Sequence, residues 1–185
     1  RRAIAVQADV SRADDVHRLV AETERAFGRL DILVNNASVF QYRPFAEITE
    51  AEWDHVLAVN LKGPFLLTQA AAPLLRRHEG AVVNICDLSA LQPWPSFAHH
   101  AASKAGLLQL TRVMARALAP DIRVNAISPG TVLPPESVDG QDGVERRVTR
   151  RAGKPEDAVA ALLYLVRSDF VTGENLVVDG GRMLL

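Results

Sequence analysis

Cysteine, methionine and tryptophan are scarce in this sequence, whose 185 residues include one cysteine, two methionines and two tryptophans. A lone Cys86 excludes an intramolecular disulfide, and chains that lack disulfides are typical of the reducing cytoplasm, where we expect this protein. Because cysteine is among the most buried residue types, we interpret Cys86 as a core side chain rather than a reactive nucleophile.

An excess of charge of one sign is also lacking, since 21 basic and 22 acidic residues give a net charge of −1. Such a chain has no electrostatic field that would attract nucleic acid or an anionic lipid surface. No apolar run reaches the ~18 residues that a membrane-spanning helix needs. We therefore expect neither a nucleic-acid partner nor a membrane association, and we expect no metal site.

The sequence does have enough apolar residues, 48%, for one domain with a real core over residues 1–185. Short apolar runs alternate along the chain with longer segments of helical periodicity. This alternation predicts a doubly wound α/β fold, in which helices cover both faces of a parallel sheet. The predicted strands are 3–8, 31–35, 81–86, 122–127 and 176–178, and the predicted helices are 12–27, 50–77, 97–119 and 153–167.

The segment from Ala81 to Gly106 concentrates polar residues that could perform chemistry. Asp87 follows a strand, and open α/β sheets bind ligands at the carboxyl ends of their strands. His100 and Lys104 are four residues apart and therefore share one helix face. Such a pair is most often a solvated helix face, but the sequence has only three lysines and the helix around this one is alanine-rich. We therefore infer a catalytic site at these three residues.

Motifs along nearly the whole chain resemble the short-chain dehydrogenase/reductase family. Each motif is weak alone, but their order and spacing together are specific. The resemblance implies a Rossmann-like domain that binds NAD(H) or NADP(H), moves a hydride between nicotinamide and a small-molecule carbonyl, imine or alcohol, and forms homodimers or homotetramers. The matching motifs are Asp9-Val10, Asp31 to Ala37, Asn60 with Gly63, Asn84-Ile85, Lys104, Arg123 to Asn125 with Pro129-Gly130, Thr172-Gly173 and Val178 to Gly181.

The resemblance also implies roles for individual residues. Asn60 is expected to anchor a water on the proton path, and Lys104 to hold the nicotinamide ribose and lower the pKa of the neighbouring acid. Residues 133–152 are expected to form a mobile loop beside the substrate. The other expected cofactor contacts are Asp9 and Val10 near the adenine, Asn36 and Ala37 near the adenosine ribose, and Pro129, Gly130 and Val132 near the carboxamide.

Two positions depart from the family pattern. The proton-donating tyrosine of the family lies four residues before the lysine, where this sequence has His100, and the family serine lies thirteen residues before that tyrosine, where this sequence has Asp87. Aspartate at this position is similar to the pteridine reductase and dihydromonapterin reductase branch, as is the tail from Phe170 to Arg182. This similarity suggests a pterin-like substrate, with Trp94 as one wall for a flat ring.

We interpret Asp87 and His100 as an acid couple that replaces the serine and tyrosine. The carboxylate favours the imidazolium form, whereas burial and Lys104 oppose it, and a pKa poised near 7 would suit a proton donor. Three alternatives remain open. His99 could take the place of its neighbour, Ser89 could stand in for the missing serine, or catalysis has been lost and the chain is a binding or oligomerisation module.

No glycine-rich turn precedes Asp9, although such a turn holds the pyrophosphate in this family. By this resemblance the fold is N-terminally truncated by about two strand–helix units, roughly 50–60 residues. We therefore expect weak cofactor binding. We also expect predicted strand 3–8 to pair directly with strand 31–35, the alternative being that 31–35 is left as a hydrophobic edge.

Overall fold

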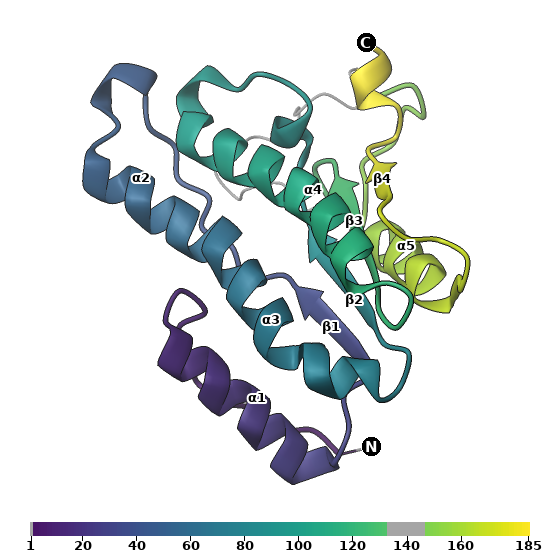
Figure 1. The fold of residues 1–185 in the computed structure, drawn as a ribbon. Coiled ribbons are helices and arrows are strands. Elements are labelled where there is room, and N and C mark those ends of the chain that lie inside the picture. The colour runs from purple at the N-terminus through teal and green to yellow at the C-terminus, as the bar shows by residue number, and fades with distance from the viewer. Residues whose placement is uncertain (1, 133–146) are drawn as a thin grey trace.

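A computed structural model describes residues 2–132 and 147–185 of the chain, which form one parallel sheet flanked by helices (Figure 1). The sheet has four strands in the order β1-β2-β3-β4, so the predicted parallel sheet is confirmed. Residues 133–146, within the expected mobile loop, lie outside the described residues. The strands are β1 (Ile32–Asn35), β2 (Ala81–Ile85), β3 (Arg123–Pro129) and β4 (Asn175–Val178).

Helices cover both faces of this sheet, as the alternating pattern predicts. On one face α3 and α4 pack against the strands, and α5 packs on the other face (Figure 1). None of the helices in the described ranges combines the length and apolar character needed to span a membrane. The helices are α1 (Ala13–Phe27), α2 (Glu50–Leu57), α3 (Gly63–Arg76), α4 (Ala98–Leu118) and α5 (Pro155–Arg167).

The core explains why β2 is apolar on both sides. Successive side chains of a strand point to opposite faces, so Val82 packs beside Leu75 and Met114, whereas Val83 packs beside Leu165 on the α5 side. Because helices cover β2 on both faces of the sheet, neither face of this strand is exposed to solvent and neither needs polar side chains. Cys86 belongs to a third buried cluster, which confirms its interpretation as a core side chain.

The N-terminal segment differs from the prediction, because residues 2–9 form no strand. They run along α1 and are held by its side chains and carbonyls: Arg18 Nη2 donates to the Gln7 carbonyl at 2.8 Å, and the Arg2 guanidinium donates to the Ala26 carbonyl. The expected pairing with β1 is therefore wrong. Instead, β1 is left as a hydrophobic edge of the sheet, which is the alternative expectation, and the side chains of Ile32 and Val34 are 43% and 38% exposed.

The predicted helix 50–77 is interrupted by a π-helical turn, Ala58–Lys62, between α2 and α3. The expected capping box is present at its start, where Thr49 Oγ1 accepts from the Glu52 backbone N–H at 3.2 Å and Glu52 Oε2 accepts from the Thr49 N–H at 3.0 Å. The π-helical turn widens the helix at Asn60. Such turns occur often at functional sites.

Candidate active site

Asp87 stands one residue beyond the end of β2, at the carboxyl edge of the sheet. One of its carboxylate oxygens accepts a hydrogen bond from the Ser89 backbone N–H at 2.7 Å, which caps the short 3₁₀-helix Leu88–Ala90. Asp87 also lines a neighbouring cavity. Because the bond to Ser89 occupies only one lone pair of one oxygen, the carboxylate can accept further hydrogen bonds.

His100, in the first turn of α4, lies directly behind Asp87. The distance from His100 Nε2 to Asp87 Oδ1 is 4.0 Å, and the His100 side chain is 3% exposed. The structure therefore brings the predicted pair together. Nε2 itself has no hydrogen-bond partner among the described residues, so it is the ring nitrogen that remains available to Asp87.

The other ring nitrogen of His100 has two possible partners, which correspond to two tautomers. Nδ1 lies 3.1 Å from the Val39 carbonyl, to which it can donate, and 3.3 Å from Asn60 Nδ2, from which it can accept. When Nδ1 accepts from Asn60, the proton resides on Nε2 and faces Asp87. When Nδ1 instead donates to the Val39 carbonyl, Nε2 has no proton and can accept one; both N–H groups of the Asn60 amide also have acceptors other than His100.

Asn60 is completely buried in the π-helical turn, and both ends of its amide are engaged. Oδ1 accepts from the Val39 N–H at 2.7 Å and from Ser38 Oγ at 3.1 Å, while Nδ2 donates to the Val39 carbonyl at 2.9 Å and to Ser103 Oγ at 3.1 Å. The family role of Asn60, holding a water, stays a prediction. In this structure its direct role is to join the loop after β1 to the first turn of α4.

Burial dominates the electrostatics of His100. Desolvation lowers the pKa of His100 below its usual 6.5, although the Asp87 carboxylate and the Val39 carbonyl raise it, and Lys104 and His99 lower it further. Burial therefore outweighs the carboxylate, and the pKa shifts away from the value near 7 that would suit a proton donor. A ring that is almost fully buried loses more hydration of its charged form than one partly solvated carboxylate at 4.0 Å restores.

Lys104 lies one helical turn after His100 and is also buried. Its Nζ donates to the Ile85 carbonyl at 2.8 Å, and burial lowers its pKa. Neither His100 nor Lys104 lines the cavity, so Asp87 is the member of the trio that reaches it. Burial also raises the pKa of the adjacent Cys86 thiol to about 12, which keeps that thiol protonated.

The two alternative residues have different surroundings. His99 is fully buried, the charged groups that act on it are Glu52 and Arg43, and burial lowers its pKa. Neither its ring nor the side chain of Ser89 lines the cavity, and the Ser89 hydroxyl has no hydrogen-bond partner among the described residues. His100 also lies outside the cavity wall, so what distinguishes it from His99 is its 4.0 Å approach to Asp87, and the choice among these residues stays a prediction.

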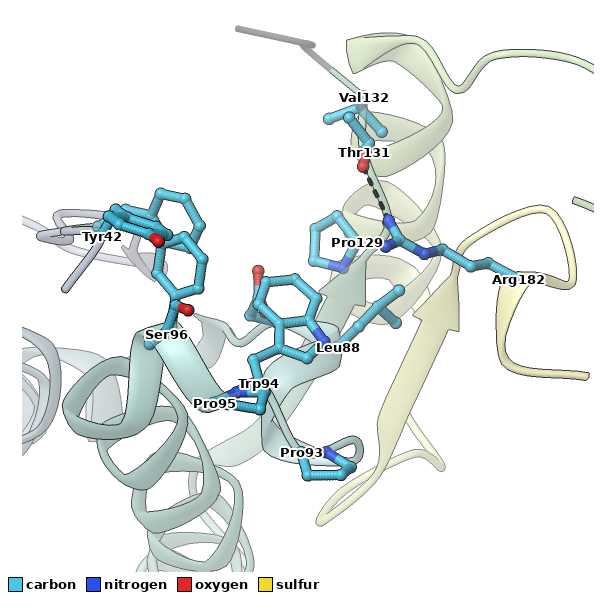
Figure 2. A pocket seen from close by; sticks show the side chains of 14 residues that line it. Tyr42, Leu88, Pro93, Trp94, Pro95, Ser96, Pro129, Thr131, Val132 and Arg182 are labelled. Atoms are coloured by element: carbon cyan, nitrogen blue, oxygen red, sulfur yellow. Dashed lines mark hydrogen bonds between the residues drawn. The ribbon is translucent and has the colours of Figure 1, made fainter. Parts of the chain in front are cut away.

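The cavity beside Asp87 has a volume of about 780 Å³ and mostly aromatic, aliphatic and proline walls (Figure 2). Trp94, the expected wall for a flat ring, lines it, as do Pro129, Gly130 and Val132 of the expected nicotinamide contact. A Cβ at Gly130 would lie 2.9 Å from the Asp179 Cα, so only glycine allows this close approach to the chain after β4.

Phe40 is a wall residue that the sequence does not single out. Its ring stacks on Phe97 with centroids 4.5 Å apart and contacts the His100 ring edge-on at 4.8 Å. Trp94 meets both phenylalanines edge-on, at 6.4 and 6.0 Å. The aromatic group therefore shields His100 from water, which contributes to its burial.

A series of hydrogen bonds between buried amide and hydroxyl side chains connects the elements at this edge of the sheet. Asn35 Nδ2 donates to Asn84 Oδ1 at 2.7 Å, Asn84 Nδ2 donates to Thr111 Oγ1 at 2.8 Å, and Thr111 Oγ1 donates to the Leu107 carbonyl at 2.8 Å. The series links β1, β2 and α4. It fixes the helix that carries His100 relative to the strand that ends at Asp87.

The expected adenosine contacts are surface residues on the far side of β1 from the cavity. Asp9 is exposed and its Oδ1 accepts from the Ser11 N–H and Oγ, at 2.9 and 2.7 Å; Val10 packs on Gly63. Asn36 and Ala37 follow β1 and are exposed. Asp9, Asn36 and Ala37 are therefore exposed and Val10 is half-buried, and their contact with a cofactor stays a prediction.

Comparisons with known proteins agree with this geometry. A family model described as enoyl-(acyl carrier protein) reductase matches residues 1–182. The chain belongs to the short-chain dehydrogenase/reductase family. It is an oxidoreductase of this family, whose cofactor is NAD or NADP.

Relatives of this short-chain dehydrogenase/reductase have different named activities. The 3-oxoacyl-(acyl-carrier-protein) reductase FabG of Thermotoga maritima is 33% identical over 95% of the chain and 75% of its own length. The 3beta-hydroxysteroid dehydrogenase 1 of Eggerthella lenta is 39% identical over 98% of the chain and 74% of its length. A solved Sinorhizobium meliloti structure, described as a short-chain alcohol dehydrogenase, superposes with a TM-score of 0.92 at 34% identity, covering 100% of this chain and 77% of that one.

Proposed function

We propose that this reductase delivers a proton through Asp87 and His100 to a carbonyl or imine that accepts a hydride. The observation that carries the proposal is the 4.0 Å approach of His100 Nε2 to Asp87 Oδ1, with the carboxylate lining the cavity and the imidazole shielded behind it. An ionisable pair at the wall of a concave, mostly apolar cavity is a typical arrangement for acid–base catalysis.

Each residue would have a separate role in proton transfer or cofactor binding. Asp87 contacts the substrate oxygen or nitrogen, receives a proton from the imidazolium of His100, and passes it to the substrate; solvent then returns a proton to His100 through Asp87, which lines the cavity and is partly exposed. Lys104 and Pro129 to Val132 would hold the nicotinamide side of NAD or NADP, and Asp9, Val10, Asn36 and Ala37 its adenosine side. When bound, the cofactor supplies or accepts the hydride.

We further propose a flat, pterin-like ring as the substrate. Three observations support it: Trp94 and Phe97 both line the cavity, Asp87 can accept hydrogen bonds from ring N–H groups, and a pteridine carries both imine and carbonyl groups. The sequence similarity of Asp87 and of the tail to the pteridine reductase branch agrees with this choice.

Steady-state kinetics of the purified protein tests both proposals, with a panel of pterins, quinones and keto compounds and with NADH and NADPH. We expect His100→Phe to abolish turnover without weakening cofactor binding. His99→Phe is the matched control, because His99 is equally buried but faces other charges, and Ser89→Ala is a second control. Full turnover in His100→Phe would exclude the proton path, and quinone reduction without pterin reduction would exclude the substrate class.

A second proposal concerns the partner of this chain, which we infer to be another copy of itself. A groove between α2, α3 and α4 has a volume of about 730 Å³ and is lined by exposed Phe65 and Val113 among other side chains. This apolar surface suits a homodimer or homotetramer contact, and it is also where a catalytically inactive chain could act as an oligomerisation module. We infer that the assembly is cytoplasmic, which cell fractionation would test.

Sedimentation velocity tests the self-association. We expect Val113→Asp to shift the protein to a smaller species, whereas Val159→Asp, a change at an equally exposed valine of α5, should leave the assembly intact. A wild-type protein that sediments as a monomer at micromolar concentration would exclude this partner.

A further inference from the structure

The cavity contains a guanidinium group that the proposed proton path does not use. Arg182 lies at the start of the C-terminal 3₁₀-helix Arg182–Leu184, directly after β4 and the turn at Gly181. Gly181 has φ +80°, and a Cβ there would lie 2.8 Å from the Val148 Cβ, so glycine is needed for the turn that sends Arg182 back over the sheet edge.

Two residues from other segments fix the position of this guanidinium (Figure 2). Arg182 Nη1 donates to Thr131 Oγ1 at 3.1 Å, and Arg182 Cζ lies 5.9 Å from the centroid of the Trp94 ring. The guanidinium carbon therefore lies over the indole within the range of a cation–π interaction, and Thr131 uses only one of the five N–H donors of the group.

No carboxylate in the described ranges forms an ion pair with Arg182. The carboxylate nearest in sequence, Asp179, is engaged by the backbone N–H groups of Gly181 and Met183, both at 2.8 Å, and so closes the turn instead. The cavity wall thus contains a positioned cation that has no anionic partner within residues 2–132 and 147–185. Asp87 is the other charged residue among those that line it.

We propose that Arg182 binds a carboxylate of the substrate, so that the substrate of this enzyme is a flat or apolar carbonyl or imine compound with an acidic group. The inference rests on the proposed function, because it places the reacting group at Asp87 and the ring on Trp94. A guanidinium fork matches a carboxylate through two parallel hydrogen bonds, and the single bond from Nη1 to Thr131 leaves donors for them.

The test uses ligands that need neither turnover nor cofactor. 2-Naphthoate and 2-naphthamide have the same ring and nearly the same shape, and only the first is charged. Binding is followed by the indole N–H signal of Trp94 in ¹H–¹⁵N NMR, assigned against Trp53→Phe, because the sequence has two tryptophans. We expect the wild-type protein to bind naphthoate about tenfold more tightly than naphthamide.

Three variants separate charge recognition from support of the cavity. Arg182→Met should weaken naphthoate about tenfold and leave naphthamide unchanged, Arg182→Lys should retain part of the preference, and Thr131→Val should weaken naphthoate about threefold because the guanidinium loses its hydrogen bond. Equal wild-type affinity for the two ligands would overturn the proposal. So would equal weakening of both ligands in Arg182→Met, which would show that the side chain only supports the cavity.

This outcome is independent of the proton path. If His100→Phe retained turnover but the preference for a carboxylate still depended on Arg182, the proton path would be refuted and the carboxylate site would be supported. Conversely, inactive His100→Phe with no preference for naphthoate would refute only the acidic substrate.

Discussion

Replacement of Asn60 by aspartate would exchange a hydrogen-bond donor for an acceptor at the centre of the candidate site. Oδ1 would still accept from the Val39 N–H, as it now does at 2.7 Å. The second oxygen would take the place of Nδ2 and face the Val39 carbonyl at about the present 2.9 Å and His100 Nδ1 at about 3.3 Å. Two oxygens without a proton between them repel each other, so the Val39 carbonyl loses the Asn60 donor and retains only His100 Nδ1, at 3.1 Å, as a possible donor.

The expected cost follows from those contacts. A lost hydrogen bond within the protein is worth about 1 kcal/mol, and a buried acceptor left without a donor costs a further 1–3 kcal/mol or so. We therefore expect Asn60→Asp to lower the free energy of unfolding by about 2–4 kcal/mol at pH 8. Ser103 cannot fully compensate, because its hydroxyl already donates to the His100 carbonyl at 2.7 Å.

The pH dependence distinguishes this variant from one that only disrupts packing. Burial lowers the pKa of His100 in the folded wild-type protein, so wild-type stability falls as the pH drops below the unfolded value of about 6.5. In Asn60→Asp the new carboxylate favours the imidazolium and raises the pKa of His100. The variant should thus lose less stability than the wild type between pH 8 and pH 6.

Urea unfolding followed by circular dichroism at pH 8 and pH 6 measures both effects, and Asn60→Ala is the control because it removes the amide without adding charge. ¹⁵N NMR of the His100 ring should show the proton on Nδ1 in Asn60→Asp, because both groups that face this nitrogen would then be acceptors. The reasoning would be refuted by a variant whose free energy of unfolding is within about 0.5 kcal/mol of the wild type at pH 8, because loss of the Asn60 donor to the buried Val39 carbonyl should destabilise the fold by more than this.

Three further predictions follow from the same contacts. His99 is fully buried with its pKa lowered by burial, so His99→Leu should reduce the loss of stability on acidification from pH 7 to pH 5, measured by urea unfolding; an unchanged pH slope would contradict this. Gly130→Ala should lower the melting temperature by several degrees, because its Cβ would lie 2.9 Å from the Asp179 Cα, whereas Gly28→Ala, at a site with no atom within 4 Å, tests backbone strain alone. The 185-residue chain, which has no glycine-rich turn before Asp9, should bind NADPH more weakly than micromolar in calorimetric titration, and micromolar affinity would refute that turn's importance here.

The meeting of Asp87 and His100 could be predicted from the sequence, because two general rules converge on it. Ligand-binding residues follow the carboxyl ends of parallel strands, and residues four apart share a helix face, so Asp87, His100 and Lys104 had to lie near one edge of the sheet. Their distances depend on more distant contacts. Asn84 and Thr111 set how α4 lies on β2, and nothing in the local pattern of either residue indicates that partner.

The pKa of His100 shows why a list of neighbours is not enough. Asp87 and Lys104 are both visible in the sequence, and their opposing charges leave the sign of the shift undecided. Burial decides it, and much of that burial comes from Phe40, whose ring edge contacts the imidazole. Phe40 reaches His100 because Asn60 holds the loop at Val39 through two backbone hydrogen bonds, a long-range contact that no periodicity reveals.

The N-terminal segment shows the opposite limitation: its local sequence pattern predicts a strand, but the structure has no strand there. Residues 3–8 have the apolar alternation of a strand, but a strand exists only where a partner offers its backbone. Since α1 packs on α3 rather than across the sheet, the segment before α1 stays beside that helix, where Arg18 donates to the Gln7 carbonyl. Ile32 and Val34 on the edge strand β1 remain partly exposed, so another strand that paired with this edge would bury apolar surface.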